Sequence, residues 1–237
     1  MKEIFYTISD EVFSSFPGYV RGVVVGRGLE NGPSPEVLTA MLRDAESSLR
    51  ERMGTTNPAE HPRITSWREA FRKTGVKPAE FRSSIEAMTR RVVKGQELPS
   101  INALVDIGNV LSLRHLVPTG GHSLDDVKDD IALRPADGEE VFVPFGETEE
   151  EHPLPGEFIF VEGNTVLTRR WSWRQANHTL TLPETKSIEF NVDGLPPVER
   201  DEVEKICSEL EELVKRFCGG TFRREILCAS NPRMSLS

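Results

Sequence analysis

Residues 98–127 read LPSINALVDIGNVLSLRHLVPTGGHSLDDV, and the character of the chain changes within them. The first half carries apolar residues at helical spacing after Ser100, which predicts an amphipathic helix with that serine as its N-cap. Beyond Pro118, residues 130–192 alternate and are interrupted by Gly and Pro, which predicts four or five strands. Helices gathered before residue 120 and strands gathered after it are typical of an α+β fold.

The chain upstream of this stretch predicts two strands followed by three helices. Ser34 is the expected N-cap of the first helix, with Pro35 at its first position, and Pro78 is expected to open the third. The expected elements are strands at 3–8 and 20–25 and helices at 34–54, 67–73 and 78–95.

The chain downstream ends in a long helix and a final strand. The helix is expected to run from Pro196-Pro197 to Phe217, because one face of it is uniformly apolar. That face comprises Val203, Ile206, Leu210, Leu213 and Phe217. We expect this stripe to pack on a mixed or antiparallel sheet built from the strands at 130–192 and 221–229.

The whole chain predicts a single domain. Nothing between residues 95 and 130 has the composition of a flexible linker. The expected parts of the domain are N-terminal strands and helices over 1–120, a strand-rich part over 121–195, and a C-terminal helix and strand over 196–230, within 1–237.

The composition excludes several classes of protein. The chain has 237 residues, with 29 Lys and Arg against 38 Asp and Glu, a net charge of −9, and 37% hydrophobic residues. No run of about 18 apolar residues occurs, so a membrane partner is not expected. The N-terminus lacks the pattern of a secretion signal, and three cysteines without a CxxC pair indicate reduced thiols in the cytoplasm. The acidic balance argues against a DNA partner or a general nucleic-acid coat.

The motifs predict no metal and no cofactor. The five histidines include no HxxxH or HxH pair, so a zinc site is not expected. The turn Gly26-Arg27-Gly28 follows a predicted strand, but Asn31 stands where a dinucleotide-binding loop has its third glycine. We therefore interpret this segment as a glycine-rich turn.

Two clusters of basic residues are candidates for binding. The first lies on the helix expected after Pro78, where residues 82, 86, 90 and 94 share a face. Its basic members are Arg82, Arg90, Arg91 and Lys94. This face is either solvated surface or a contact for the phosphate backbone of RNA.

The second cluster is RRWSWRQ at residues 169–175. Alternation along a strand would place Trp171 and Trp173 on one face and Arg170, Ser172 and Arg174 on the other. Tryptophans more often belong to a core than to a ligand site. Arginines and a glutamine beside them nevertheless suit a pocket for a carboxylate, phosphate or nucleobase.

Several segments resemble one known family. The stretch at 98–127 resembles the B3/B4 domain of the phenylalanyl-tRNA synthetase β subunit, which carries a VDVTN element, a helix and a HAFD-like tetrapeptide. The counterparts are Val105-Asp106-Ile107-Gly108-Asn109 and His122-Ser123-Leu124-Asp125, and TKSIEFNVDGL at 185–195 resembles the strand written TxxVLLESA. The likeness to free-standing bacterial B3/B4-domain proteins is closer and covers about residues 10–230. They share FPGYVRGVVV, SWREAFRKTGVKPAEFRSSIEAMTRRV, LPSIN and RRWSWRQ.

The resemblance implies an editing site. In the synthetase, this domain hydrolyses the ester of tyrosine wrongly attached to the phenylalanine tRNA, without a bound metal. The family's pocket uses the histidine of the HAFD-like element, a threonine and a glutamate. His122 matches the histidine, Gly108 stands at the threonine position, Asn191 stands at the glutamate position, and Asp193 replaces a small residue. The resemblance therefore implies where the pocket lies.

We assign catalysis to His122 on this basis. Ser123 is expected to cap a short helix at 124–127, and the dipole of that helix would keep the imidazole of His122 neutral. A neutral imidazole can orient water towards an activated ester or donate to the oxyanion. The expected substrate-binding residues are Asn109, Arg170, Trp173, Arg174, Asn191 and Asp193. We expect His122, Arg174 and Asn191 to line one cavity.

Three functions remain open from the sequence. The first is hydrolysis of a mischarged aminoacyl-tRNA or a related amino-acid ester. The second is a non-catalytic module that binds tRNA or another RNA. The third is a pocket for an amino acid or amine, with Arg174 and Asp193 as opposite poles. Arg174 either grips a phosphate or the terminal adenosine, or forms an ion pair with an acid such as Asp106 or Asp193.

Overall fold

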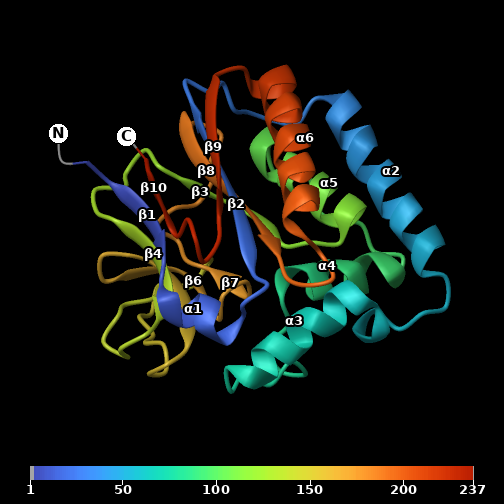
Figure 1. Cartoon of the computed structure of the whole chain (residues 1–237). Helices are drawn as coiled ribbons and strands as arrows, with labels where there is room; N and C mark the ends of the chain where they lie inside the picture. Colours follow the sequence, from blue (N-terminus) through green and yellow to red (C-terminus); the bar gives the residue numbers. More distant parts are fainter. Residues whose placement is uncertain (1–2, 237) are drawn as a thin grey trace.

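Two β-sheets form the centre of the molecule (Figure 1). The computed structural model describes residues 3–236. The six-stranded sheet has the order β10 (Arg233–Ser235), β1 (Phe5–Ile8), β4 (Ile131–Pro135), β5 (Phe158–Glu162), β6 (Thr165–Arg169), β7 (Arg174–Gln175). The four-stranded sheet has the order β3 (Thr119–Ser123), β8 (Ser187–Gly194), β2 (Val20–Arg27), β9 (Thr221–Leu227). Strands β1 and β4 pair in parallel, and the other named pairs are antiparallel.

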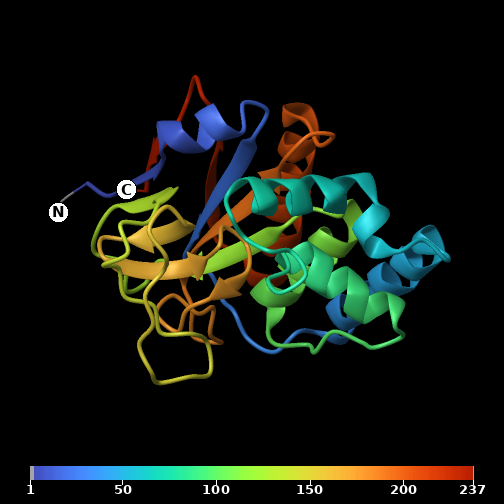
Figure 2. The same ribbon diagram turned by 90° about the horizontal axis from the view of Figure 1, so that it is seen from below.

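Helices cover the four-stranded sheet on the side away from the other sheet. Helices α5 (Ala103–His115) and α6 (Arg200–Cys218) lie on the sheet, and α2 (Glu36–Met53) packs on α5. Helices α3 (Pro62–Lys73) and α4 (Ser84–Val93) and a 3-10 turn (Pro58–Glu60) lie below them, while α1 (Asp10–Ser15) lies near β4. Figure 2 shows α2 to α5 gathered on one side and β4 to β6 on the other. This arrangement confirms the α+β class and the single domain.

The apolar stripe of the last helix packs on the four-stranded sheet, as predicted. Val203, Ile206 and Leu210 are fully buried, and α6 contacts β2, β8 and β9. The helix lies close to β2 because Gly22 has no side chain. A Cβ at Gly22 would lie 2.2 Å from the Sγ of Cys207, which is too close for any real contact. The glycine therefore sets the spacing between helix and sheet.

The expected single sheet is wrong, because its strands divide between two sheets. Strands β4 to β7 join the six-stranded sheet, whereas β8 and β9 join the four-stranded one. The reason lies in β8, where both faces are buried. Successive residues of β8 face opposite sides. The even-numbered residues face the helices, and the odd-numbered residues, which are the polar Glu189, Asn191 and Asp193, face the other sheet. Alternation alone showed a strand but could not show its partners.

Two serines predicted as N-caps, Ser34 and Ser100, bind a carboxylate and do not cap a helix. Helix α2 begins at Glu36, after Pro35, and α5 begins after Asn102, whose side chain accepts from the N–H of Val105. Ser34 and Ser100 instead donate their hydroxyls to the carboxylate of Asp106, at 2.6 Å for Ser34. Asp106 is fully buried. These hydrogen bonds satisfy a charge that burial would otherwise destabilise, and they fix both segments against α5.

Within residues 3–236, no helix is long and apolar enough to cross a membrane.

Candidate functional site

A polar cavity of about 200 Å3 lies where the two sheets meet. We call it the inner cavity. Strands β2, β3 and β8 supply Arg21, His122, Asn191 and Asp193, and β5 and β6 supply Phe160 and Thr168 from the other sheet. Its remaining named walls include Asn109 on α5 and the segment 171–175. The structure thus brings His122, Arg174 and Asn191 together on one cavity, with Asn109, Trp173 and Asp193.

A second compartment of about 500 Å3 adjoins the inner cavity, and we call it the outer pocket. Both are lined by Asn109, Thr119, Gly120, Gly121, Trp173, Arg174 and Gln175. The other walls of the outer pocket are mostly apolar, and Gly108 is among them. Ile101, Phe145 and Leu182, which are 56%, 61% and 45% exposed, all lie on it. The candidate site therefore consists of a cavity with many polar side chains and an adjoining, mostly apolar pocket.

His122 lies in strand β3, and the helix expected directly after it is absent. Residues 124–127 form a turn instead, so no helix dipole acts on the imidazole. Its Nδ1 lies 2.7 Å from Oγ1 of Thr179, and its Nε2 lies 3.2 Å from Oγ1 of Thr168. Burial, followed by the charge of Arg21, lowers the pKa of His122 to about 3. The imidazole is therefore neutral at neutral pH because of burial, not because of a helix.

Asp193 belongs to a buried ion pair. Arg21, which is 1% exposed, donates Nε to Oδ1 at 2.6 Å and Nη2 to Oδ2 at 3.1 Å. Tyr19 and Asn191 also donate to the same carboxylate. The predicted role of Asp193 as a pole for an amine is therefore wrong. Its charge is already neutralised, and a ligand cation would have to displace Arg21.

Asn191 is placed beside a glycine of the neighbouring strand. Its Nδ2 donates to Oδ2 of Asp193 at 3.0 Å, which directs its amide oxygen towards Gly120. A Cβ at Gly120 would lie 3.1 Å from that oxygen. The pairing of β3 with β8 puts Gly120 directly opposite Asn191, so the glycine makes room for the amide at the cavity.

The segment 169–175 does not continue as a strand. Strand β6 ends at Arg169, and Arg170 and Trp171 have φ values of 47° and 63°, in the left-handed region. This turn cancels the expected alternation. Trp171 packs in the core against Tyr19 and Trp67, Trp173 packs against Phe81, and both tryptophans line the inner cavity. The strand predicted through these residues is therefore wrong, although both tryptophans reach one cavity, and Arg170 lines neither compartment of the site.

Arg174 forms an ion pair at the rim of the site, but with a partner that the sequence did not suggest. Its Nη2 lies 2.7 Å from Oε1 of Glu147, and the two side chains are 33% and 48% exposed. The acids expected from the sequence, Asp106 and Asp193, are buried and satisfied elsewhere.

Replacing Arg174 by lysine is expected to lower the free energy of unfolding by less than ~1 kcal/mol, because the ion pair is largely solvated. Chemical denaturation would measure this. Glu147→Gln is the matched control, since it removes the acidic partner of this ion pair and leaves the guanidinium in place. A loss of several kcal/mol in Arg174→Lys alone would show that the guanidinium has a structural role that Glu147 does not share.

The basic face predicted for the helix after Pro78 is not formed. Helix α4 begins at Ser84, not at Pro78, because Ser83 caps it, so Arg82 precedes the helix. Glu86 is fully buried and binds Arg90 at 2.8 Å and Arg68 at 2.7 Å. Arg91 donates to the carbonyl of Glu97, and Lys94 is the C-cap residue. Arg82, Arg90, Arg91 and Lys94 are therefore not one continuous surface.

Sequence reasoning missed a buried acid beside the site. Glu189 is fully buried, and neither of its carboxyl oxygens has a hydrogen-bond partner among the residues that the structure describes. It lies directly opposite His122 in the pairing of β3 with β8. Burial raises the pKa of Glu189 to about 8; the charge of Arg21 opposes this shift and that of Asp193 adds to it. The sequence sign of this buried acid was a charged residue between the apolar Ile188 and Phe190 in a strand. Arg21 shows the same sign of a buried charge, because it lies among the valines of β2.

Within residues 3–236, no three His, Cys, Asp or Glu side chains lie close enough together to hold a metal ion.

The fold and the two-part pocket define an α+β domain with a chamber between sheets. The B3/4 domain family matches residues 66–219, and the chain belongs to this family. That match includes His122, Asn191 and the whole segment 169–175.

Among solved structures, one similar chain is an N-terminal fragment of the phenylalanyl-tRNA synthetase beta-subunit from Pyrococcus horikoshii. The sequence identity is 14% and the TM-score is 0.47. The alignment covers 94% of this chain and 51% of that one, so this chain spans about half the length of the fragment. Among curated proteins, none matches.

Proposed function

We propose that this chain binds the aminoacyl end of an aminoacyl-tRNA, or a related amino-acid ester, and hydrolyses it. The observation that carries the proposal is the pair of adjoining compartments, which share seven lining residues. The inner cavity of about 200 Å3 is polar, and the outer pocket of about 500 Å3 is apolar. An amino-acid ester has the same two parts. Membership of the B3/4 family, whose synthetase member edits such esters, supports the choice.

The chemistry of the site sets the mechanism. An ester of this kind is activated, so hydrolysis requires mainly a positioned water and a stabilised oxyanion. His122 has a pKa of about 3 and cannot take a proton efficiently at neutral pH. Its role in the proposal is to hold the attacking water through Nε2, in place of the 3.2 Å contact with Thr168, and the proton that the water loses passes to the leaving alcohol of the ester. Asn191, beside it on the inner cavity, supplies an amide to orient the ester.

A second candidate is binding of an amino acid or similar small molecule without hydrolysis. Both ring nitrogens of His122 already have threonine partners, at 2.7 and 3.2 Å. An imidazole held in this way serves as well to line a binding pocket as to orient water. This observation favours the binder over a catalyst that needs a free base.

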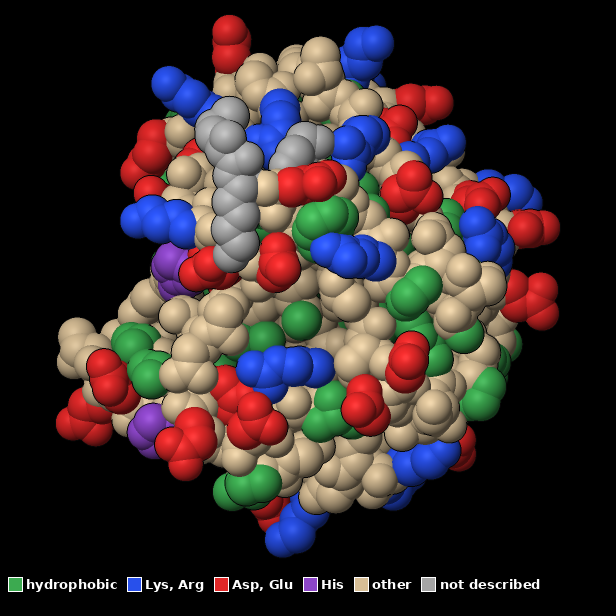
Figure 3. All heavy atoms as spheres, turned by 60° about the vertical axis from the view of Figure 1, so that its left-hand side comes forward, with side chains coloured by type: hydrophobic (Ala, Val, Ile, Leu, Met, Phe, Trp, Pro, Cys, Tyr) green, Lys and Arg blue, Asp and Glu red, His purple; other side chains and the backbone are tan. Residues whose placement is uncertain are grey.

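A bare RNA-binding module has less support. The basic residues predicted for it are dispersed, and Arg90 is turned to a buried acid. Figure 3 shows acidic and basic side chains interspersed over one face of the molecule, with no broad basic area on that face. A duplex or tRNA backbone binds best to a continuous basic surface. Contact with RNA in this proposal is therefore confined to the aminoacyl end.

The decisive experiment is a deacylation panel. The protein is incubated with tRNAs charged with different amino acids, and with the corresponding simple amino-acid esters, and loss of the ester is followed over time. We expect turnover of esters with large apolar side chains. Phe145→Asp and Leu182→Asp, at exposed positions of the outer pocket, are expected to lower kcat/KM by about tenfold or more, since ~1.4 kcal/mol is a factor of ten. Val37→Asp is the matched control, because Val37 is 53% exposed and lies on α2.

Three outcomes separate the candidates. Equal losses in Val37→Asp and in the pocket variants would reject the assignment of the outer pocket. Binding of free amino acids without turnover of any ester would favour the second candidate. Absence of both binding and turnover would reject the proposed function.

A further inference from the structure

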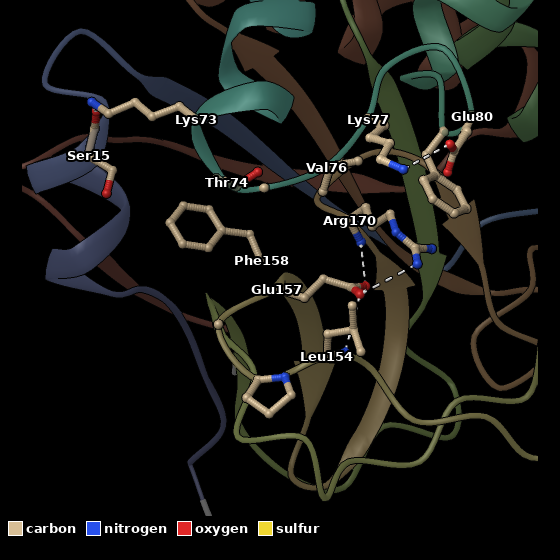
Figure 4. Close-up of a pocket in the computed structure, with 14 residues that line it drawn as sticks. Ser15, Lys73, Thr74, Val76, Lys77, Glu80, Leu154, Glu157, Phe158 and Arg170 are labelled. Carbon is tan, nitrogen blue, oxygen red and sulfur yellow. Dashed lines mark hydrogen bonds and ion pairs between the residues drawn. The ribbon is translucent and has the colours of Figure 1, made fainter.

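A pocket of about 730 Å3 lies on another part of the surface (Figure 4). We call it the Arg170 pocket. One wall comes from the end of α3 and the segment after it, namely residues 73–77, Glu80 and Phe81. The other walls are Ser15 at the end of α1, residues 154–158 leading into β5, and Arg170. The pocket shares no lining residue with the inner cavity or the outer pocket. Whatever binds there is therefore a separate ligand or a separate part of one.

Arg170 is the unusual group in this pocket. Its side chain is only 10% exposed, and its Nη1 is buried with no hydrogen-bond partner in the described part of the chain. The nearest acid, Glu157, lies 3.8 Å from Nη2. That carboxylate is already held by two hydrogen bonds from Arg169, at 2.9 and 2.8 Å. A guanidinium thus remains buried with its charge only partly balanced, which is costly without a ligand.

The guanidinium is also held in a fixed orientation. Its central carbon lies 3.7 Å from the ring centroid of Phe81 and 4.4 Å from that of Trp173. The backbone of Arg170 is in the left-handed region, which few side chains favour. Burial lowers the pKa of Arg170, while Glu157 acts against this shift. A planar group with uncommitted N–H donors, fixed by two rings, is arranged to receive an anion.

Two lysines extend the positive charge across the pocket. Lys73 and Lys77 are both exposed, and Figure 4 shows them on the segment above Arg170. Lys73 donates to the carbonyl of Ser15, and Lys77 pairs with the exposed Glu80 at 3.3 Å. Lys73 also lies over the ring of Phe16, 5.1 Å from its centroid. Both lysines are at the surface, and the exposed pair of Lys77 with Glu80 is weak, so a bound anion can draw their ammonium groups towards it.

The rest of the lining is apolar. Val76, Phe81, Pro155 and Phe158 form much of the wall, and Leu154 is 67% exposed at its edge. The pocket therefore combines cations with apolar walls in a volume suited to a small organic molecule.

We propose that the Arg170 pocket is a second ligand site, which binds a phosphate or carboxylate carried on a planar or apolar body. The anionic group binds Arg170, with Lys73 and Lys77 closing over it, and the body lies against Phe158 and Leu154. Two sources fit this chemistry: a nucleotide, whose phosphate and base supply the two parts, and an aromatic carboxylic acid.

The test is calorimetric titration of the full chain with two matched pairs of probes. Adenosine monophosphate is compared with adenosine, and benzoate with benzyl alcohol. We expect at least one anion to bind at least tenfold more tightly than its neutral counterpart. Binding by the nucleotide alone identifies the first source, and binding by benzoate alone identifies the second.

Variants at exposed positions locate the site without risk to folding. Lys73→Glu and Lys77→Glu are each expected to weaken binding of that anion by about tenfold. Arg72→Glu is the matched control, because Arg72 is exposed in the last turn of the same helix but does not line the pocket. Arg170→Lys, which keeps the charge but loses the planar donor pair, is expected to weaken binding as well.

Three results would overturn the proposal. They are no binding of either anion, equal binding of the neutral probes, and a loss in Arg72→Glu equal to that in the lysine variants. None of these results would reject the proposed ester hydrolysis, because the Arg170 pocket shares no lining residue with the inner cavity or the outer pocket.

Discussion

The Asp193→Ala variant is expected to lose about 3–5 kcal/mol of its free energy of unfolding, the cost of leaving one partner of a buried ion pair uncompensated. Asp193 is 1% exposed and is the acid that binds Arg21, with Nε at 2.6 Å. Removing it leaves the guanidinium between the sheets with Tyr6 as its remaining named partner, at 2.7 Å. Asn191 also loses the acceptor of its Nδ2 hydrogen bond.

Urea denaturation monitored by circular dichroism measures this loss. Glu204→Ala is the control, because Glu204 forms a solvent-exposed pair with Arg200, at 3.3 Å, with the two side chains about half exposed. Surface pairs of this kind are worth less than ~1 kcal/mol. A loss in Asp193→Ala no greater than in Glu204→Ala would show that water or another group takes over the charge of Arg21.

The free energy of unfolding is expected to fall by about 2 kcal/mol as the pH rises from 6.5 to 8.5, because one buried group has a higher pKa in the folded than in the unfolded protein. The responsible group is Glu189, whose pKa is about 8 in the folded protein and 4.5 ordinarily. Between these two values the folded chain holds a proton that the unfolded chain has released. Unfolding then releases a proton, so raising the pH favours the unfolded state.

His122 acts in the opposite sense at lower pH. Its folded pKa is about 3 against 6.5 ordinarily, so unfolding takes up a proton between these values. Its contribution to stability therefore falls as the pH drops below 6.5. From pH 4.5 to 6.5 the two effects cancel, and the pair Glu189 and His122 predicts a stability plateau there, with losses on either side.

Glu189→Gln isolates the alkaline part of this profile. The variant has no titrating group at this position, so its stability is expected to change less than that of the wild type between pH 6.5 and 8.5. Glu225→Gln is the control, because Glu225 is exposed on β9 of the same sheet. The measurement is the slope of the unfolding free energy against pH. An unchanged slope in Glu189→Gln would show that Glu189 is ionised throughout this range.

The local structure was predictable where one physical signal dominated. The stripe of α6 was confirmed because its burial follows directly from apolar residues at helical spacing. Helix starts were less predictable, since Ser34 and Ser100 were recruited by Asp106, which is distant from Ser34 in the sequence. A capping rule considers only the neighbouring backbone and cannot anticipate a buried carboxylate that competes for the hydroxyl.

The candidate site shows the same division. The resemblance pointed to His122 and Asn191, and the structure brings them to one cavity. It gave no indication of Thr168 and Thr179, whose hydroxyls hold the imidazole, because they come from segments far from His122 in the sequence. Arg170 was misplaced for another reason. The left-handed turn at Arg170 and Trp171 carries no glycine to mark it, so strand alternation was carried through a bend.

The order of strands bears on how the chain folds during synthesis. Both hydrogen-bonded neighbours of β2 come late, β8 from Ser187 and β9 from Thr221. Likewise β1 has β10 on one side, with Phe5 opposite Ser235. A nascent chain emerging from the ribosome therefore carries the valine-rich β2 unpaired until β8, at Ser187–Gly194, has been made. The helix that packs on β2 is α6, which also comes late in the sequence, and contacts so far apart in sequence are slow to close, so β2 stays open to aggregation for longer than the helices do.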